Sequence, residues 1–168
     1  MLFWRTMVMF RPEFTDPFGK STLASCSMKV AVASDHAGFA LKQEVLSWLS
    51  ELGHEPVDLG PADDSRVDYP DFGKKLADAV AAQEVERGIA ICGTGIGISM
   101  AANRVPGVRA ALCTDGLMAR LTRLHNDANV LALGARLIGP ETARDCVETF
   151  LNTAYEGGRH DARVAKLG

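Results

Sequence analysis

The chain has 168 residues, of which 47% are hydrophobic and 23% charged, and its formal net charge is −3. This balance is typical of one globular domain with a sizeable core, and it favours neither nucleic acid nor an acidic membrane surface as a partner. No apolar run approaches the roughly 20 residues that a membrane-spanning helix needs. The four cysteines lie far apart without a C-x-x-C pair, so we expect no zinc site and no disulfide framework, and a cytoplasmic location fits.

The first 27 residues lack the pattern of the rest of the chain. They begin with an apolar stretch that Arg5 interrupts, and they continue in turn-forming residues without a period. A secretory signal would need a longer apolar run and a cleavage site of small residues. We therefore expect 1–27 to be a disordered extension or the product of a start codon placed too far upstream, and we expect one domain over 28–168.

From Met28 onward, short apolar runs alternate with segments of helical spacing. This alternation predicts an α/β fold, with a single-domain, Rossmann-like, doubly wound parallel sheet of about five strands in three α/β/α layers. Ligands bind such sheets at the carboxyl ends of the strands, so the residues that follow each strand are the first candidates for a site. We expect strands at 29–34, 55–60, 88–92, 108–113 and 129–134, and helices at 40–53, 71–84, 98–105, 116–125 and 139–155.

The stretch "ICGTGIGIS" at 91–99 is the most informative segment. Gly93, Gly95 and Gly97 follow a predicted strand and precede a predicted helix, where backbone N–H groups can form a concave anion site. A dinucleotide fingerprint needs G-x-G-x-x-G and a following acidic residue, and the spacing here matches it only in part, with Asp115 as the acidic candidate. A P-loop needs a lysine, and a phosphatase loop needs an arginine where Ile98 stands, so both are excluded.

The cysteine of this segment, Cys92, leaves two interpretations open. A cysteine at a helix N-terminus, beside backbone donors, favours the thiolate form, which can act as a nucleophile or a general base. The same residue could instead be a buried structural cysteine in a tight turn. The segment alone does not decide between a catalytic and a structural thiol.

Other polar residues could reach the same crevice. Asp35 and His36 end the first predicted strand, and they could face Cys92 or merely cap the next helix. His125 is predicted to follow a helix, where it could be an acid or base or simply be solvated. Two further arginines, Arg159 and Arg163, are four residues apart. They would share one face of a helix, either to clamp an oxyanion or as solvated charges.

With Arg136, which follows the last predicted strand, these candidates include a thiolate, a carboxylate, histidines and arginines, but no cluster of metal ligands. Moving a carbonyl between adjacent sugar carbons needs a base for the C1 and C2 protons, donors for an enediolate oxygen and cations for a phosphate. That chemistry requires neither a metal nor an organic cofactor. The alternative is a nucleotide- or phosphate-binding module without catalysis, which would have no use for a reactive thiol at Cys92.

Five segments resemble a known family. They are "SDHAGFALK", "DYPDF", "GIAICGTGIGISMAANR", "RLHNDANVLALGARLIG" and "YEGGRHDARV", in this order over 28–165, and the family is that of ribose-5-phosphate isomerase B and galactose-6-phosphate isomerase. The resemblance implies an aldose–ketose isomerase for ribose 5-phosphate and ribulose 5-phosphate. It leaves open the same chemistry on four-carbon (erythrose or erythrulose 4-phosphate) or six-carbon (allose or galactose 6-phosphate) substrates. It also implies a homodimer or homotetramer with active sites shared between subunits.

The resemblance further implies a role for each matching residue. Cys92 would be the base at C2, because Ile98 stands where another branch of the family has a glutamate base. Asp35 would move hydroxyl protons, and His125, contributed with Asn126 by the partner subunit, would assist ring opening. No role follows for Leu117 and Met118. Thr94 with the amides of Gly93, Gly95 and Gly97 would stabilise the enediolate, Tyr69 would line the pocket, and His36, Arg136, Arg159 and Arg163 would bind the phosphate.

Overall fold

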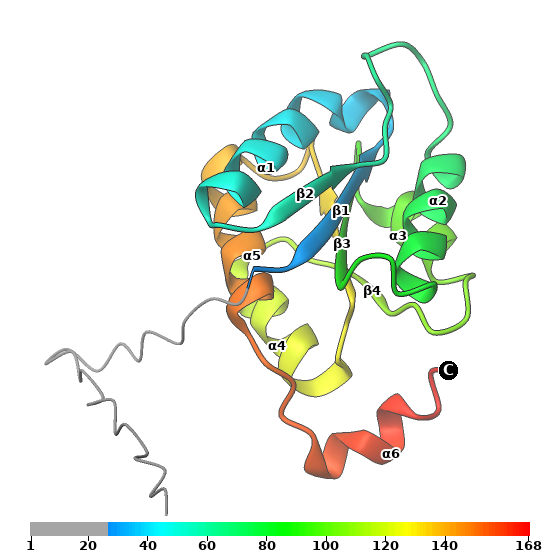
Figure 1. The fold of residues 1–168 in the computed structure, drawn as a ribbon, viewed down its shortest axis with the longest axis vertical. Coiled ribbons are helices and arrows are strands. Elements are labelled where there is room, and N and C mark those ends of the chain that lie inside the picture. Colours follow the sequence, from blue (N-terminus) through cyan, green and yellow to red (C-terminus); the bar gives the residue numbers. More distant parts are fainter. Residues whose placement is uncertain (1–26) are drawn as a thin grey trace, which may run out of the picture.

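A computed structural model describes residues 27–168, so the expectation for the N-terminal extension concerns residues that lie, except for Ser27, outside the described part. Five parallel strands form one sheet in the order β2-β1-β3-β5-β4 (Figure 1). The predicted α/β fold with a five-stranded parallel sheet is therefore confirmed. The strands are β1 (Lys29–Ser34), β2 (Glu55–Asp58), β3 (Arg87–Cys92), β4 (Ala110–Leu112) and β5 (Val130–Gly134).

Helices cover both faces of the sheet, as the predicted three-layer arrangement requires (Figure 1). One face packs against α1, α4 and α5, and the opposite face packs against α2 and α3. Across the described residues, the helices are too short or too polar to cross a lipid bilayer. The longer helices are α1 (Phe39–Glu51), α2 (Tyr69–Ala81), α3 (Ile96–Ala102), α4 (Gly116–Asn126) and α5 (Pro140–Asn152), and the short ones are η1 (His36–Gly38), η2 (Gly158–His160) and α6 (Asp161–Val164).

Side-chain size differs between the two faces of the sheet. Val30 and Val32 of β1 point toward α1, α4 and α5, whereas Ala31 and Ala33 point toward α2 and α3, because successive side chains of a strand alternate between faces. On the alanine face α2 comes very close to β3, since a Cβ at Gly88 would lie 2.5 Å from Leu76. The small residues of the strands therefore decide where α2 and α3 can pack.

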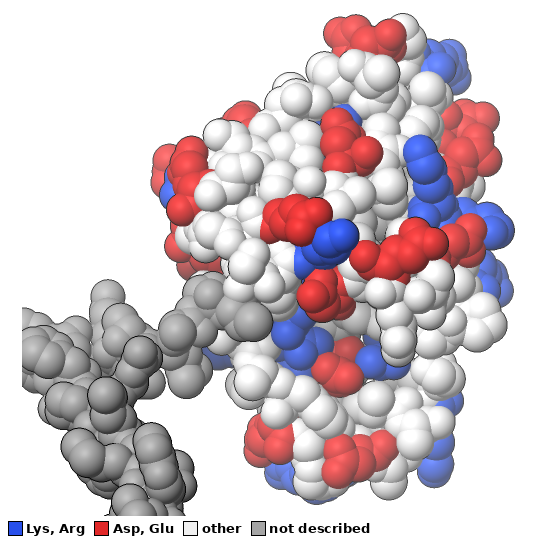
Figure 2. Space-filling model, viewed as in Figure 1, with Lys and Arg blue, Asp and Glu red and all other residues white. Residues whose placement is uncertain are grey.

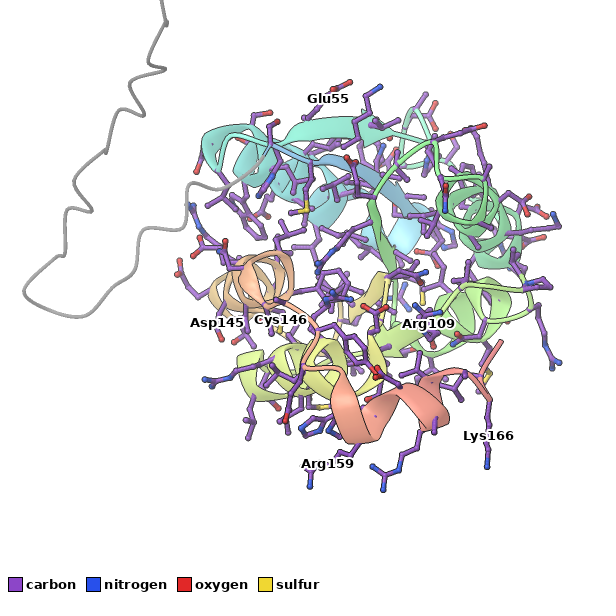
Figure 3. All side chains as sticks on the ribbon, turned by 60° about the horizontal axis from the view of Figure 1, so that its bottom comes forward. Glu55, Arg109, Asp145, Cys146, Arg159 and Lys166 are labelled. Carbon is purple, nitrogen blue, oxygen red and sulfur yellow. The ribbon has the colours of Figure 1, made fainter. Side chains whose placement is uncertain are left out.

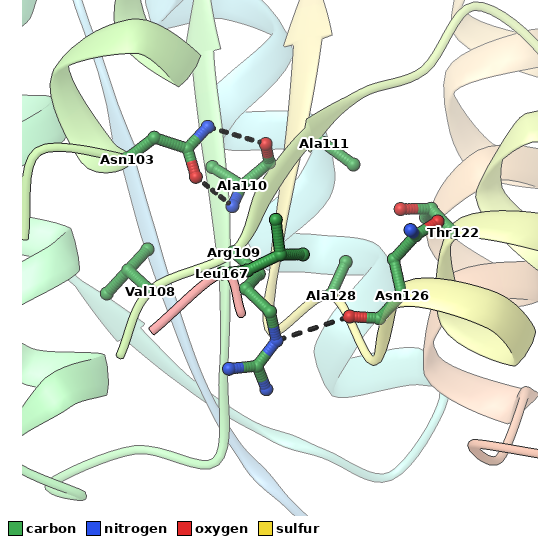
Figure 4. Close-up of a pocket in the computed structure, with 9 residues that line it drawn as sticks. All are labelled: Asn103, Val108, Arg109, Ala110, Ala111, Thr122, Asn126, Ala128 and Leu167. Carbon is green, nitrogen blue, oxygen red and sulfur yellow. Dashed lines mark hydrogen bonds between the residues drawn. The ribbon is translucent and has the colours of Figure 1, made fainter. Parts of the chain in front are cut away.

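The helix after the glycine loop differs from its prediction. It spans Ile96–Ala102 rather than 98–105, because Gly95 adopts the left-handed conformation (φ 75°) and starts the helix two residues earlier. Its end is set by Asn103, whose side-chain amide donates to the carbonyl of Ala110 and accepts from its amide, both at 2.8 Å (Figure 4). Asn103 thus satisfies backbone groups of β4, which is an edge strand of the sheet. The strand β4 is itself shorter than the predicted strand at 108–113.

A buried lysine anchors the loop between β2 and α2. Lys42 of α1 is fully buried, and its Nζ donates to both carboxylate oxygens of Asp58, at 2.7 and 2.8 Å, and to the carbonyl of Pro61 at 2.8 Å. The same helix, predicted at 40–53, also buries Leu41, Val45 and Leu49, which share its apolar face. The lysine ties α1 to the loop that leads into α2 at Tyr69.

The C-terminal segment lies far from the carboxyl ends of the strands. It forms η2 and α6, and Figure 1 shows it below the amino ends of the strands, whereas η1 and the 59–68 loop lie at the carboxyl ends. The amide of Glu156 donates to the carbonyl of Leu124 at 3.1 Å, which fastens the start of this segment to the end of α4. Tyr155 adds a hydrogen bond from its hydroxyl to Asp161 at 2.9 Å.

Candidate active site

Cys92 and Asp35 are neighbours at the carboxyl ends of β1 and β3. The register pairs Ser34 with Ile91, so the next residue on each strand, Asp35 and Cys92, lies beside the other. The amide of Asp35 donates to the carbonyl of Ile91 at 3.0 Å, which continues the pairing to this point. Both residues are buried, and one carboxylate oxygen of Asp35 accepts from the amide of Gly38 at 2.9 Å. A thiol and a carboxylate therefore lie at neighbouring strand ends, where ligands bind such sheets.

The glycine loop donates a hydrogen bond to the sulfur of Cys92. The amide of Gly95 donates to Sγ of Cys92 at 3.0 Å, and an N–H donor at this position stabilises negative charge on the sulfur. The Oγ1 of Thr94 accepts from the amide of Ile96 at 3.3 Å. Within residues 27–168 the amides of Gly93 and Gly97 have no protein acceptor. The predicted group of converging donors is thus partly occupied by the thiol, and two of its amides stay free for a ligand oxygen.

Two larger side chains pack against the glycines of this loop. Arg136 lies over Gly93, with its Nη1 3.5 Å from the position that a Cβ would take. Tyr69 lies against Gly97, where a Cβ would come within 2.7 Å of the phenol ring. At Gly97 only a glycine leaves room for the tyrosine ring, whereas at Gly93 the arginine lies at ordinary contact distance. The sequence placed Arg136 and Tyr69 in the site, and the structure brings both to the glycine loop.

His36 also lies at this edge of the sheet. Its Nδ1 is 3.1 Å from the carbonyl oxygen of Val67, in the loop that Lys42 anchors. The ring is therefore oriented by the 59–68 loop rather than free in solvent.

A second group of predicted residues lies at the opposite edge of the sheet. His125 and Asn126 occupy the last turn of α4, so the helix predicted at 116–125 is confirmed to within one residue and His125 lies within it rather than after it. The helix starts at Gly116, beyond the carboxyl end of β4, and ends shortly before β5 begins. Its 11 residues cover about 16 Å, so His125 lies roughly that far from the edge that carries Cys92.

His125 belongs to a cluster with three C-terminal residues. Its ring stacks on that of His160, with centroids 4.5 Å apart and planes inclined by 15°. Each histidine has its Nε2 3.8 Å from a carboxylate oxygen of Glu156, and the Nε of Arg159 donates to Nε2 of His160 at 3.3 Å. Burial, His125 and Arg159 together lower the pKa of His160. Arg159 projects outward from this segment (Figure 3), and Arg163 follows on α6.

The same cluster is the one place among the described residues where three potential metal ligands converge. His125, Glu156 and His160 offer atoms within 4.8 Å of one another. The two rings are nearly parallel, so they would have to rotate before both nitrogens could ligate one ion.

Comparisons with known proteins decide the family. A family model described as Ribose/Galactose Isomerase matches residues 30–167. The chain belongs to the ribose/galactose isomerase family. Ribose-5-phosphate isomerase B of Escherichia coli is 49% identical over 139 residues, which make up 83% of this chain and 93% of the relative.

Solved structures agree with this assignment. The ribose-5-phosphate isomerase B of Clostridium thermocellum has a TM-score of 0.83 and 54% identity, over 84% of this chain and 95% of that one. The type B ribose 5-phosphate isomerase of Trypanosoma brucei has a TM-score of 0.82 and 46% identity, over 84% of this chain and 97% of that one. The resemblance seen in the five sequence segments is therefore confirmed as membership of the ribose/galactose isomerase family.

In this member of the ribose/galactose isomerase family, the predicted site residues fall into two groups. The carboxyl-edge group lies at the carboxyl ends of the strands and contains Cys92, Thr94, Gly93, Gly95, Gly97, Asp35, His36, Tyr69 and Arg136. The amino-edge group lies toward the amino ends of the strands and contains His125, Asn126, Arg159 and Arg163. Sequence reasoning missed Glu156 and His160, although both belong to the "YEGGRH" segment that it quoted. Their spacing to His125 along the chain carries no signal, because only folding brings them together.

Proposed function

We propose that this chain interconverts ribose 5-phosphate and ribulose 5-phosphate. The observation that carries the proposal is the thiol of Cys92, buried beside Asp35 and held by the amide of Gly95 at 3.0 Å. Relatives that bear the name ribose-5-phosphate isomerase B, at 49% identity in sequence and 54% in a solved structure, support this substrate. A binding module without catalysis would not need a sulfur and a carboxylate at the same strand ends.

The proposed reaction moves one proton between carbons and another between oxygens. Cys92, as thiolate, takes the proton from C2 of the open-chain aldose and later delivers it to C1. Asp35 transfers a hydroxyl proton from O2 to O1, so that the carbonyl moves from C1 to C2. The negative oxygen of the enediolate between these steps accepts hydrogen bonds from the free amides of Gly93 and Gly97 and from the hydroxyl of Thr94. These donors are fixed in place before the substrate binds.

We propose that each complete site forms between two copies of the chain. The carboxyl-edge group contains the base, but His125 and Asn126, for ring opening, and Arg159 and Arg163, for the phosphate, lie at the other edge of the same chain. A second copy with its amino edge over the first copy's Cys92 would complete the set. His36 and Arg136 of the first copy would then share the phosphate, and Tyr69 would line the sugar pocket.

Exposed apolar side chains support this assembly. Such residues lie on α3 and α4, the helices on either side of the edge strand β4. They include Met100, at 63% exposure, and Leu117, at 57%. Large apolar side chains exposed next to one another mark protein interfaces. The set is Ile96, Met100, Leu117, Met118 and Leu121.

The test is turnover by the purified chain. Four-, five- and six-carbon aldose phosphates are offered separately, with a chelator present, and the ketose product is measured. We expect ribose 5-phosphate to react fastest and the chelator to have no effect. Reaction in deuterated water should place deuterium at C2 of recovered ribose 5-phosphate, because the thiol exchanges its proton with solvent. Faster turnover of a four- or six-carbon substrate would assign the enzyme to that substrate instead of ribose 5-phosphate. No turnover of any substrate would favour a binding module without catalysis.

The expected cytoplasmic location also stays a proposal. It is supported by three free cysteines within residues 27–168, namely Cys92, Cys113 and Cys146, all of them buried.

A further inference from the structure

Three arginines line one pocket at the amino ends of the strands, away from Cys92. Arg87 opens β3, Arg109 directly precedes β4, and Arg123 lies on α4. The pocket has a volume of about 610 Å³. In Figure 2 basic and acidic side chains meet in a hollow in the lower middle of the view, between the body of the sheet and the C-terminal segment.

The positive charge in this pocket exceeds the negative charge. The carboxylate of Asp127 serves two of the arginines, with 2.8 Å from Arg123 to Oδ1 and 3.1 Å from Arg109 to Oδ2. The other carboxylate in the lining, Glu86, accepts a hydrogen bond from the amide of Lys29 at 2.7 Å. Within residues 27–168 Arg87 forms no ion pair, and its Nη1 donates to the carbonyl of Phe150 at 2.7 Å.

Arg87 and Arg123 are close enough to repel each other. Both guanidinium groups lie over the ring of Phe150, at 5.2 and 5.8 Å from its centroid. Burial and the charge of Arg123 lower the pKa of Arg87 to about 10, so the group is still charged at neutral pH. Of these two like charges, Arg123 pairs with Asp127, whereas Arg87 has no carboxylate partner within residues 27–168.

The fold explains two of the arginines but not the third. Arg109 and Arg123 donate to backbone carbonyls and hold Asp127, whose φ of 45° is left-handed, at the end of α4. Arg87 contacts the carbonyl and the ring of Phe150, but no carboxylate among the described residues neutralises its charge. In the described part of the chain, the only buried polar side-chain atom without a partner is the hydroxyl of Ser34, so the guanidinium nitrogens without a protein acceptor are open to solvent.

We propose that this pocket binds a phosphate group, as free phosphate or as a phosphate monoester, between Arg87, Arg109 and Arg123. A tetrahedral oxyanion accepts hydrogen bonds from several guanidinium groups at once, and guanidinium is the side-chain group best suited to phosphate. The ligand supplies the counter-charge that the pocket lacks. This site lies outside the proposed catalytic residues, and the inference does not depend on the proposed function.

The test is calorimetric titration of the full chain with inorganic phosphate and, separately, with glycerol 3-phosphate, at constant ionic strength. The proposed catalytic site also takes phosphate, so the titration uses an Arg159→Ala/Arg163→Ala background. In that background we expect one remaining site per chain. Adding Arg87→Gln, which keeps a donor for the Phe150 carbonyl, should weaken binding about tenfold or more, the loss expected for one charge-assisted contact.

Two controls separate the pocket from general charge and from misfolding. Arg144→Gln removes an arginine from the surface of α5, where it pairs with Glu51 and Glu148, and should leave the affinity within about twofold because it is distant from the pocket. Arg87→Lys keeps the charge and should retain part of the binding. Tighter binding of the ester or of free phosphate identifies the ligand class. No site in the background variant, or equal affinity with and without Arg87→Gln, would overturn the proposal.

Discussion

The amide of Gly95 donates a hydrogen bond to the sulfur of Cys92 across 3.0 Å. The N–H of Gly95 points back to the end of β3, and Gly95 itself, with a left-handed φ of 75°, leads the chain from there into α3. The glycine loop therefore fixes the thiol at the carboxyl end of the strand, and within the described residues the amides of Gly93 and Gly97 have no protein acceptor. This relationship makes Cys92 and Gly95 the first residues to change.

We expect Cys92→Ala to abolish isomerisation while the chain still binds sugar phosphate. Loss of a positioned acid or base costs about 10²- to 10⁴-fold in rate. The measurement compares kcat in a ketose-detection assay with Kd from calorimetry. Cys146→Ala, which removes another buried cysteine, on the core-facing side of α5, is the matched control and should keep its turnover. Full activity in Cys92→Ala would contradict the mechanism.

Gly95→Ala is expected to destabilise the fold as well as lower the rate. A Cβ there would lie 2.9 Å from the carbonyl carbon of Leu133 and 3.1 Å from the nitrogen of Gly134, which are backbone atoms and cannot move aside easily. With the left-handed φ, we expect a loss of about 2 kcal/mol or more in the free energy of unfolding, measured by urea denaturation.

Gly93→Ala is the control for stability, since its Cβ would meet only the side chain of Arg136, at 3.5 Å. A substitution in ordinary van der Waals contact should cost less than about 1 kcal/mol. Equal destabilisation by the two alanines would show that the turn at Gly95 has no special requirement.

Mixing two inactive variants tests whether sites are shared. Cys92→Ala keeps an intact amino-edge group, and His125→Ala keeps an intact carboxyl-edge group. If each site takes Cys92 from one copy and His125 from another, random exchange of equal amounts should restore roughly a quarter of the wild-type activity, because half of the dimers are mixed and each holds one complete site. No recovery, after exchange of subunits has been verified with differently tagged chains, would place both residues in the site of one chain.

Arg159→Ala should raise KM about tenfold, with a smaller effect on kcat, if this arginine holds the phosphate away from the reacting carbons. Steady-state kinetics with ribose 5-phosphate gives both parameters. Arg144→Ala removes a surface arginine that pairs with Glu148 and should change neither. An unchanged KM in Arg159→Ala would remove the phosphate role.

Stability should decrease as the pH falls below about 6.5. Burial lowers the pKa of His54 and of His160 from the ordinary value of 6.5, with contributions from Arg87 for the first and from His125 and Arg159 for the second. The unfolded chain then binds protons at a higher pH than the folded chain, so the free energy of unfolding is retained above 6.5 and is lost as the pH falls through the lowered values. Urea denaturation between pH 8 and 5 measures the slope. His54→Asn should flatten it, and an unaltered slope would contradict the assignment.

Much of the fold followed from local patterns. The alternation of short apolar runs with helical spacing predicted the parallel sheet. Strands that are buried on both faces are rich in β-branched residues and alanine, so they can be recognised from the sequence without tertiary information. Helix ends were less accurate. The start of α3 depended on the left-handed Gly95, and its end depended on Asn103, whose partner Ala110 lies on another element. The local sequence pattern around Asn103 does not reveal that Ala110 is its partner.

The sequence alone determined the family, the fold class and the residue types of the site. The five matching segments, and the alternation of short apolar runs with helical spacing, are properties of the chain itself. Only the tertiary structure decided which of those residues meet. It placed Cys92 beside Asp35 through the register of β1 and β3, and it put His125 at the far edge, stacked on His160. It also gathered Arg87, Arg109 and Arg123 around one pocket. Such contacts join residues that are distant along the chain, and strand order and helix packing, rather than spacing, bring them together.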